Sequence, residues 1–206
     1  MAIDRDSTVE WMRGFAAAIA EHRAELVQLD TAIGDGDHGT NMDRGMRKAI
    51  EQLDESPPED PGGALKTVAM ALVSSVGGAA GPLYGTLLLK LGGELEDEPE
   101  PDLHRFAAAW RVALDGVIAR GKAAPGDKTM IDALEPAVAA LARATDLDAG
   151  LAAAAAAAEE GMRATTPLVA RRGRASYLGE RSAGHQDPGA TSTYHLFKSA
   201  AEALAD

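Results

Sequence analysis

Apolar side chains recur every three or four positions along most of this chain, which is the spacing of one face of an α-helix. The first such segment runs from a predicted capping box over residues 7–10 through Trp11 and Phe15 to an end near Asp30. Further segments with this period cover about 39–53, 63–76, 83–91, 103–120, 128–142, 146–165 and 190–203. Few stretches alternate with a period of two, so no sheet is predicted. Eight helices with short connections predict an all-α fold, an eight-helix antiparallel up-and-down bundle or barrel.

The connections between these predicted helices fall into two kinds that alternate along the chain. Unusual polar residues and glycines gather at residues 30–41, 77–85, 121–130 and 171–193. The connections in between, at 57–63, 92–101 and 143–148, look like ordinary solvent-facing turns. In an antiparallel up-and-down arrangement every second connection lies at the same end. The alternation therefore predicts that the four unusual loops meet at one rim and form one site.

The first unusual loop carries three carboxylates, Asp30, Asp35 and Asp37, within eight residues and with glycines between them. Hard divalent cations such as Mg2+ prefer oxygen ligands of this kind. A helix start follows directly, and a helix N-terminus favours phosphate. The alternative is an acidic surface turn, since Asp and Gly are common in turns. An EF-hand is excluded, because its fifth position would be Gly39 and no Glu closes the loop at position twelve.

Each of the other three loops is open to two interpretations. The small residues of 77–85 would let a backbone approach a ligand, or would let two helices pack closely. In 121–130, Asp127 is interpreted as an acid of the site or as a helix N-cap, and Met130 as core or as a cover for a flat purine. The fourth loop has four arginines between residues 171 and 189, typical of a lid that clamps an anion or of a mobile, solvated loop.

Composition narrows the classes of function. With 206 residues, the chain is predicted to form one domain over 1–206. Hydrophobic residues make up 46% of the chain but aromatic residues only 4%, a composition that favours closely packed helices. The formal net charge of −12 argues against nucleic acid as a direct partner. The absence of cysteine excludes disulfides, thiolate catalysis and sulfur-ligated zinc. No apolar run approaches the length of a membrane span, so a cytoplasmic location is expected.

Four long motifs resemble the nucleotide-binding L subunit of dihydroxyacetone kinase, the DhaL family. They are AIGDGDHGTNM at 32–42, SSVGGAAGPLYG at 74–85, PGDKTM at 125–130 and GRASYLGERSAGHQDPGATS at 173–192. They occur in the family's order, and the resemblance covers nearly the whole chain. It implies an eight-helix antiparallel barrel that binds ADP or ATP at one rim through two Mg2+ ions.

The resemblance also implies roles for individual residues. Asp30, Asp35 and Asp37 match the family's Mg2+ ligands. The residues that match its nucleotide contacts, on the phosphate side, on the base side and in the lid, are His38, Gly39, Thr40, Asn41, Ala79, Ala80, Gly121, Met130, Arg174, Asp187, Pro188 and Gly189. Many members have a serine where this chain has Ala80, so one hydroxyl to the phosphate is missing. We therefore expect a shift in affinity or phosphate geometry rather than a loss of binding.

In this family a separate K subunit holds dihydroxyacetone covalently through a histidine, and no residue here stands out as a substrate base. The resemblance thus implies a kinase subunit that passes a phosphoryl group from Mg-bound nucleotide to dihydroxyacetone on the K subunit. A phosphocarrier M subunit of the phosphotransferase system would recharge the nucleotide. Two alternatives stay open: an ATP-dependent kinase for another short keto sugar such as a tetrulose, and a nucleotide-loaded regulator of a transcription factor. A homodimer is also left open.

Overall fold

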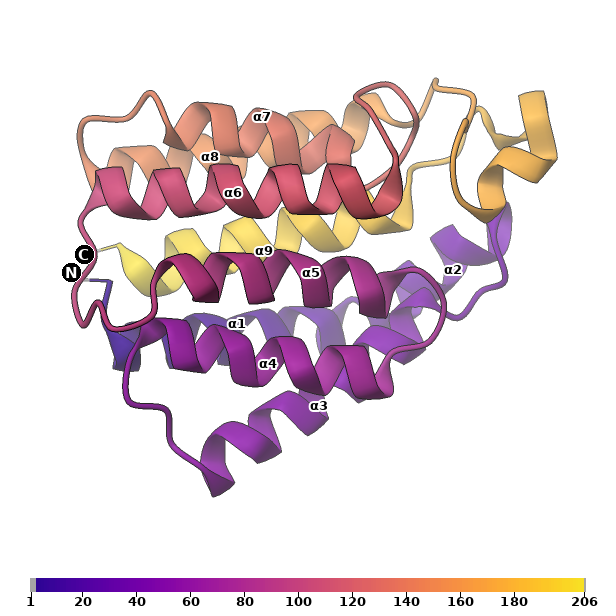
Figure 1. Cartoon of the computed structure of the whole chain (residues 1–206). Coiled ribbons are helices and arrows are strands. Elements are labelled where there is room, and N and C mark those ends of the chain that lie inside the picture. The colour runs from indigo at the N-terminus through magenta and orange to yellow at the C-terminus, as the bar shows by residue number, and fades with distance from the viewer. Residues whose placement is uncertain (1–2, 206) are drawn as a thin grey trace.

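The computed structural model describes residues 3–205, and this part of the chain folds into helices without a β-strand. The long helices lie side by side (Figure 1). The elements are α1 (Arg5–Glu21), α2 (Arg23–Ile33), α3 (His38–Glu55), α4 (Pro61–Ser75), α5 (Ala80–Glu94), α6 (Leu103–Gly121), α7 (Ile131–Leu141), α8 (Leu147–Ala164), the 3-10 helix η1 (Arg174–Ser182) and α9 (Pro188–Leu204). None of the helices in residues 3–205 combines the length and the apolar character needed to cross a bilayer.

The long helices form a closed ring. From α3 to α9 each long helix packs against the next, and α9 returns to α1, which packs against α3 and α4. The predicted all-α, antiparallel up-and-down arrangement is confirmed. Both chain ends lie at one end of the ring, which we call the far end, together with the α3–α4, α5–α6 and α7–α8 connections (Figure 1). The α2–α3, α4–α5 and α6–α7 connections and η1 lie at the other end, the rim.

The number of helices differs from the predicted eight in two places. The first predicted helix is divided into α1 and α2, because His22 has φ −91° and ψ 10° and so leaves the helical conformation. The ring of His22 stacks on buried His195 of α9, with 4.2 Å between the ring centroids, and its Nδ1 lies 2.9 Å from Glu25 Oε2. The stretch between the helices predicted over 146–165 and 190–203 contains η1. Neither change alters the order of the helices round the ring.

Helices that begin at the far end all begin with an aspartate N-cap. The predicted capping box at Ser7 is wrong by one turn: Asp4 is the cap, its Oδ1 accepting the Ser7 N–H at 2.8 Å while Ser7 Oγ accepts the Asp4 N–H at 2.9 Å. Asp60, Asp102 and Asp146 begin α4, α6 and α8 in the same way, each accepting the N–H three residues later. Such a cap typically contributes about 1 kcal/mol, so these helix starts are well defined.

Aromatic side chains from three helices form the centre of the core. Trp11 of α1 packs edge-on against Phe106 of α6, and Trp110 of α6 stacks on Phe197 of α9 with centroids 4.5 Å apart. Trp11 also donates its indole N–H to the Leu196 carbonyl oxygen at 2.9 Å. Aromatic pairs of this geometry stabilise beyond the area they bury. The contacts hold α1, α6 and α9 in register and so support the loops at the rim.

Candidate functional site

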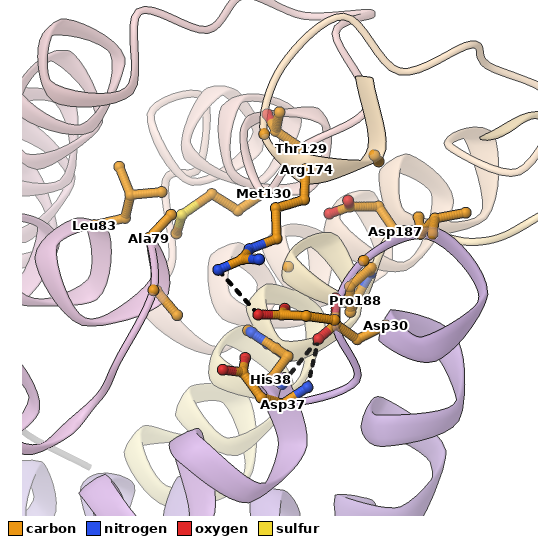
Figure 2. Close-up of a pocket in the computed structure, with 18 of the residues that line it drawn as sticks. Asp30, Asp37, His38, Ala79, Leu83, Thr129, Met130, Arg174, Asp187 and Pro188 are labelled. Carbon is orange, nitrogen blue, oxygen red and sulfur yellow. Dashed lines mark hydrogen bonds and ion pairs between the residues drawn. The ribbon is translucent and has the colours of Figure 1, made fainter. Parts of the chain in front are cut away.

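A cavity opens at the rim, and all four of the unusual loops line it (Figure 2). Asp30 reaches it from the last turn of α2 and His38 from the first turn of α3. Ala79 precedes α5, Met130 precedes α7 and Asp187 precedes α9. The structure thus brings together segments that are far apart in the sequence, as the alternation of connections predicts.

Three carboxylates form an acidic cluster on one side of this cavity. One side-chain oxygen from each of Asp30, Asp35 and Asp37 lies within 4.8 Å of the others. Asp30 Oδ2 accepts the backbone N–H groups of Asp37 at 2.8 Å and of His38 at 3.0 Å, which turns the loop back onto α2. Gly34 is needed here, because a Cβ atom on it would lie 2.1 Å from Asp30 Oδ1. The donor set is all oxygen and negatively charged, and therefore suits a hard divalent cation such as Mg2+.

Arg174, at the start of η1, brings a positive charge to the cluster. Its Nη2 lies 3.0 Å from Asp35 Oδ2, and Figure 2 shows the side chain reaching down from η1 toward the aspartates. The Arg174 side chain is 63% exposed, so the pair is solvated and adds little to stability. A guanidinium in this position is well suited to meet phosphate oxygens at the mouth of the cavity.

Helices that begin at the rim are capped differently from those at the far end. The N-cap residues Asp37 of α3, Ala79 of α5 and Met130 of α7 make no side-chain cap hydrogen bond. Only α9 has a side-chain cap, from Asp187. First-turn N–H groups have no partner within their own helix, and the helix dipole favours negative charge there. Three helix N-termini around one cavity therefore suit a polyanion such as phosphate.

His38 is held by a chain of hydroxyl groups beneath the cavity. Its Nε2 lies 2.9 Å from Ser192 Oγ, and Tyr84 donates its hydroxyl hydrogen to the same oxygen at 2.8 Å. Burial lowers the pKa of His38, although Asp30 and Asp37 oppose this shift. Burial also raises the pKa of Tyr84 to about 12, so the phenol stays protonated and remains a donor. The network fixes the orientation of the His38 ring beside the carboxylates.

Two charged residues, Asp187 and Lys128, are buried next to the segment that joins α8 to α9. Asp187 caps α9 by accepting the Ala190 N–H at 2.7 Å. Burial raises the pKa of Asp187 to about 7, with a further contribution from Asp132 and opposition from Lys128. The Lys128 side chain donates to backbone carbonyls of the segment that joins α8 to α9. Burial lowers the pKa of Lys128, which Asp187 and Asp132 partly offset.

An apolar hollow adjoins the cavity on the side away from the carboxylates. Leu83 of α5, Val117 of α6 and Met130 before α7 line it, together with Gly121. In Figure 2 the side chains of Leu83, Ala79 and Met130 lie together on this side. The arrangement separates an apolar end from a charged end, as a nucleotide requires.

Most of the predicted site residues line the cavity: Asp30, Asp35, Asp37, His38, Asn41, Ala79, Ala80, Met130, Arg174, Asp187, Pro188 and Gly189. Gly121 lines the adjoining hollow instead. Gly39 and Thr40 line neither. A Cβ atom on Gly39 would lie 2.3 Å from the Arg23 carbonyl oxygen, so Gly39 lets α2 and α3 pack closely, whereas Thr40 is exposed on α3.

Several residues of the site were not predicted: Leu83 lines the cavity, and three others, Tyr84, Lys128 and Ser192, form hydrogen bonds there. All three lie inside the motifs that carry the family resemblance. Their partners are 37 to 154 positions away in the sequence, however, and no local pattern shows such contacts. Their presence in long motifs is the signal that could have marked them.

The fold and the site together define an all-helical barrel whose rim suits a metal-bound phosphate. A family model described as the DAK2 domain matches residues 32–202. The chain is 42% identical over 202 residues to the "PEP-dependent dihydroxyacetone kinase, ADP-binding subunit DhaL" of Escherichia coli (strain K12), covering 96% of each chain. The chain therefore belongs to the DAK2 domain family, and its similarity to this DhaL subunit extends over its full length.

Larger kinases contain a region similar to this chain. The crystal structure of the dihydroxyacetone kinase from C. freundii in complex with AMP-PNP and Mg2+ matches with a TM-score of 0.72 and 28% identity. The match covers 95% of this chain but 33% of that enzyme, so the chain spans about a third of its length. The "D-erythrulose kinase" of Mycolicibacterium smegmatis is 42% identical over 183 residues, covering 86% of this chain and 32% of that protein.

Proposed function

We propose that this chain is the nucleotide-binding subunit of a dihydroxyacetone kinase and that it presents Mg-bound ADP or ATP at its rim. The observation that carries the proposal is the meeting of three carboxylates with three helix N-termini that lack side-chain caps. The full-length similarity to an ADP-binding subunit and the AMP-PNP and Mg2+ complex of the C. freundii kinase support the same ligand. The residues present fit such a ligand in both charge and shape.

Each part of the site would have a separate task in phosphoryl transfer. Asp30, Asp35 and Asp37 would hold Mg2+, in our proposal two ions, and the metal would neutralise phosphate charge as transfer proceeds. The N–H groups at the starts of α3 and α5 would bind phosphate oxygens, and Arg174 would close over them. At α5 only backbone donors would serve, because Ala80 carries no hydroxyl. Leu83 and Met130 would cover the base.

Transfer also needs an acceptor, and we propose that a separate K subunit supplies it. The acidic cluster at residues 30–37 is accounted for by the nucleotide, and the apolar hollow by its base. Nothing else that lines the cavity suggests a covalent site for a keto sugar. The name of the E. coli relative supports recharging of bound ADP from phosphoenolpyruvate, which we assign to a phosphocarrier M subunit. The chain would thus be one half of a sugar kinase, which we expect to act in the cytoplasm.

Mass spectrometry of the purified, native protein would test the ligand directly, and we expect retained ADP with Mg2+. Incubation with a phosphorylated phosphocarrier subunit should convert this ADP to ATP, and the carrier should lose its phosphoryl group. The isolated chain should not phosphorylate dihydroxyacetone, and adding a K subunit should restore transfer. Appreciable turnover by the isolated chain, free of contaminating kinase, would refute the half-enzyme proposal. Failure to bind Mg-ADP under any of these conditions would refute the nucleotide site itself.

A second substrate is favoured by one comparison. The D-erythrulose kinase relative is as identical to this chain as the E. coli subunit is, although over a shorter stretch. The K subunit would choose the keto sugar, because the rim described here holds only the nucleotide. Pairing this chain in turn with K subunits of known preference should therefore give the sugar specificity of the K subunit. A specificity that stays the same whichever K subunit is supplied would contradict this assignment.

A further inference from the structure

Lys128 has a charged side chain that is almost completely enclosed, with 1% of its surface exposed. It lies just before α7, under the segment of residues 165–187 that joins α8 to α9, which we call the lid segment. Its Nζ donates to the carbonyl oxygens of Thr165 at 2.8 Å, Leu168 at 3.1 Å and Thr166 at 3.3 Å. It also donates to the carbonyl oxygen of His185. One ammonium group therefore contacts both the entry and the exit of the lid segment.

The four carbonyl oxygens around Lys128 Nζ require a cation. A lysine ammonium group has three N–H donors and no acceptor, while the four carbonyl groups offer acceptors only. Charge-assisted hydrogen bonds of this kind are stronger than neutral ones. A buried charge without partners is very unfavourable, so Lys128 is stable only while its carbonyl partners stay in place. Because these come from both ends of the lid segment, the two ends are held together by one charge.

Neighbouring hydrogen bonds close the same junction. The Gly184 N–H donates to the Thr166 carbonyl oxygen at 2.8 Å, and the Asp187 N–H donates to Thr165 Oγ1 at 3.0 Å. The lid segment therefore leaves and returns through a single hinge with Lys128 at its centre. Beyond the hinge, Ala170 and Ala175 pack on Ile33 of α2, while Tyr177 of η1 is 89% exposed. The hinge holds the two ends of the lid segment, and this small apolar contact holds η1 against α2.

We propose that Lys128 is a positioning residue that locks the hinge of the lid segment and so places Arg174 over Asp35. Figure 2 shows Arg174 above the acidic cluster, where its guanidinium pairs with Asp35. The consequence for nucleotide release rests on the proposed function, whereas the hinge is present in the protein by itself. The two claims can therefore fail separately.

Hydrogen exchange of residues 173–182 without nucleotide tests the hinge. Lys128→Met keeps the volume of the side chain and removes the charge, and we expect exchange at least about tenfold faster than in the unaltered protein. Lys66→Met is the matched control, because Lys66 of α4 pairs with exposed Glu96 toward the far end. It should leave exchange in the lid segment unchanged. Equal exchange in the Lys128→Met variant and the unaltered protein would overturn the proposal.

Release of Mg-ADP tests the consequence for the ligand. We expect Lys128→Met to speed release about tenfold and to change capture much less, since most affinity changes appear in the off-rate. Faster exchange with unchanged release would overturn the placement of Arg174 by the hinge. If the unaltered protein binds no Mg-ADP, the proposed function fails, and the exchange experiment still decides whether Lys128 holds the hinge.

Chemical rescue tests whether Lys128 acts through its charge and N–H donors or only by filling space. Lys128→Ala leaves room beside the carbonyl oxygens, and added methylammonium should slow the exchange again, because it supplies N–H donors and a positive charge. Tetramethylammonium has the charge but no N–H donors and should have no effect. If neither variant folds, Lys128→Gln keeps N–H donors without charge and should show faster exchange. Exchange equal to that of the unaltered protein in Lys128→Gln, or no response to methylammonium, would overturn the role of the charge.

Discussion

The helices that begin at the two ends of the ring differ in the side-chain capping of their first turns. At the far end, Asp4, Asp60, Asp102 and Asp146 each accept an N–H from the helix they precede. At the rim, the N-cap residues of α3, α5 and α7 make no such bond, although Asp30 accepts the His38 N–H and Thr129 accepts the Ile131 N–H. Both ends are rich in acidic residues, so composition does not separate them. What differs is how the carboxylates are grouped: each of the four at the far end caps its own helix, whereas Asp30, Asp35 and Asp37 lie together at the rim, although Asp30 also accepts two backbone N–H groups.

This difference indicates that the rim contributes less to the stability of the fold than the far end does and is arranged for binding. N-caps typically stabilise by about 1 kcal/mol each, and clustered carboxylates repel one another. At the rim, the N-cap residues of three helices make no side-chain cap, three negative charges lie together and Asp187 is buried. A cation and a polyanion bound together would satisfy the uncapped helix starts and the clustered carboxylates at once. The following experiments test this contrast between the ends, from the largest expected effect to the smallest.

Removing one charge from the acidic cluster should nearly abolish binding. Asp35→Asn keeps the side-chain size but weakens the metal ligand, and we expect Mg-ADP affinity to fall by about 100-fold or more, since even partners behind a metal ligand contribute 10–100-fold. Isothermal titration calorimetry in Mg2+ would measure it. Asp102→Asn, an acidic residue of the far end, is the matched control and should bind normally. An unchanged affinity in Asp35→Asn would refute the metal assignment.

The buried Asp187 should make stability depend on pH. Its pKa is raised from 3.8 to about 7 in the folded protein, so folding takes up a proton between these values. Stability should therefore fall as pH rises from about 4 to above 7. Asp187→Asn can still cap α9 but carries no charge. It should be more stable than the unaltered protein at pH 8 by a few kcal/mol, because each tenfold change in proton affinity corresponds to about 1.4 kcal/mol.

Urea unfolding at pH 5 and pH 8 would measure this difference. At pH 5 the carboxyl group of folded Asp187 is protonated while that of the unfolded chain is still mostly ionised, so the advantage of Asp187→Asn should shrink to less than about half of its value at pH 8. The same substitution at Asp102 controls for the change of a cap residue. A stability difference between Asp187→Asn and the unaltered protein that is equal at both pH values would contradict the role of the buried charge.

Arg174 should act on release of the nucleotide. Its side chain is exposed and pairs only with Asp35 among the described residues, so Arg174→Ala should change the unfolding free energy little. Release of Mg-ADP should become about tenfold faster, while capture changes less. Stopped-flow displacement of a fluorescent ADP analogue would measure both rates. Arg181→Ala, elsewhere on η1, is the control; equal release from the two variants would remove support for a closing role of Arg174.

A helix N-cap at the far end should affect the free energy of unfolding but not the binding of nucleotide. Asp146 Oδ1 accepts the Ala149 N–H at 2.9 Å at the start of α8. Asp146→Ala should lower the free energy of unfolding by about 1 kcal/mol and leave Mg-ADP affinity unchanged. Thermal unfolding and calorimetry on the same sample would show this. Weaker nucleotide binding in Asp146→Ala would mean that the two ends are coupled and do not divide stability and binding between them.

The sequence determined most of the architecture, because helix period and the alternation of connections are local properties. The spacing of apolar residues predicted all but one of the boundaries between neighbouring α-helices, and the parity of the loops predicted which segments meet at the rim. It missed the break at His22, where the ring stacks on His195 of α9, a contact that no local pattern shows. It also misplaced the first cap, because both Asp4 and Ser7 are residue types that begin helices.

For the site, the sequence by itself marked residues whose chemistry is local, and the tertiary structure decided the others. Asp30, Asp35 and Asp37 lie on one glycine-rich loop, so their proximity could be predicted from spacing. The enclosure of Lys128 and the raised pKa of Asp187 could not, because both depend on how completely other segments remove them from water. Burial and hydrogen bonding across distant segments are properties of the packed ring, and no local pattern contains them.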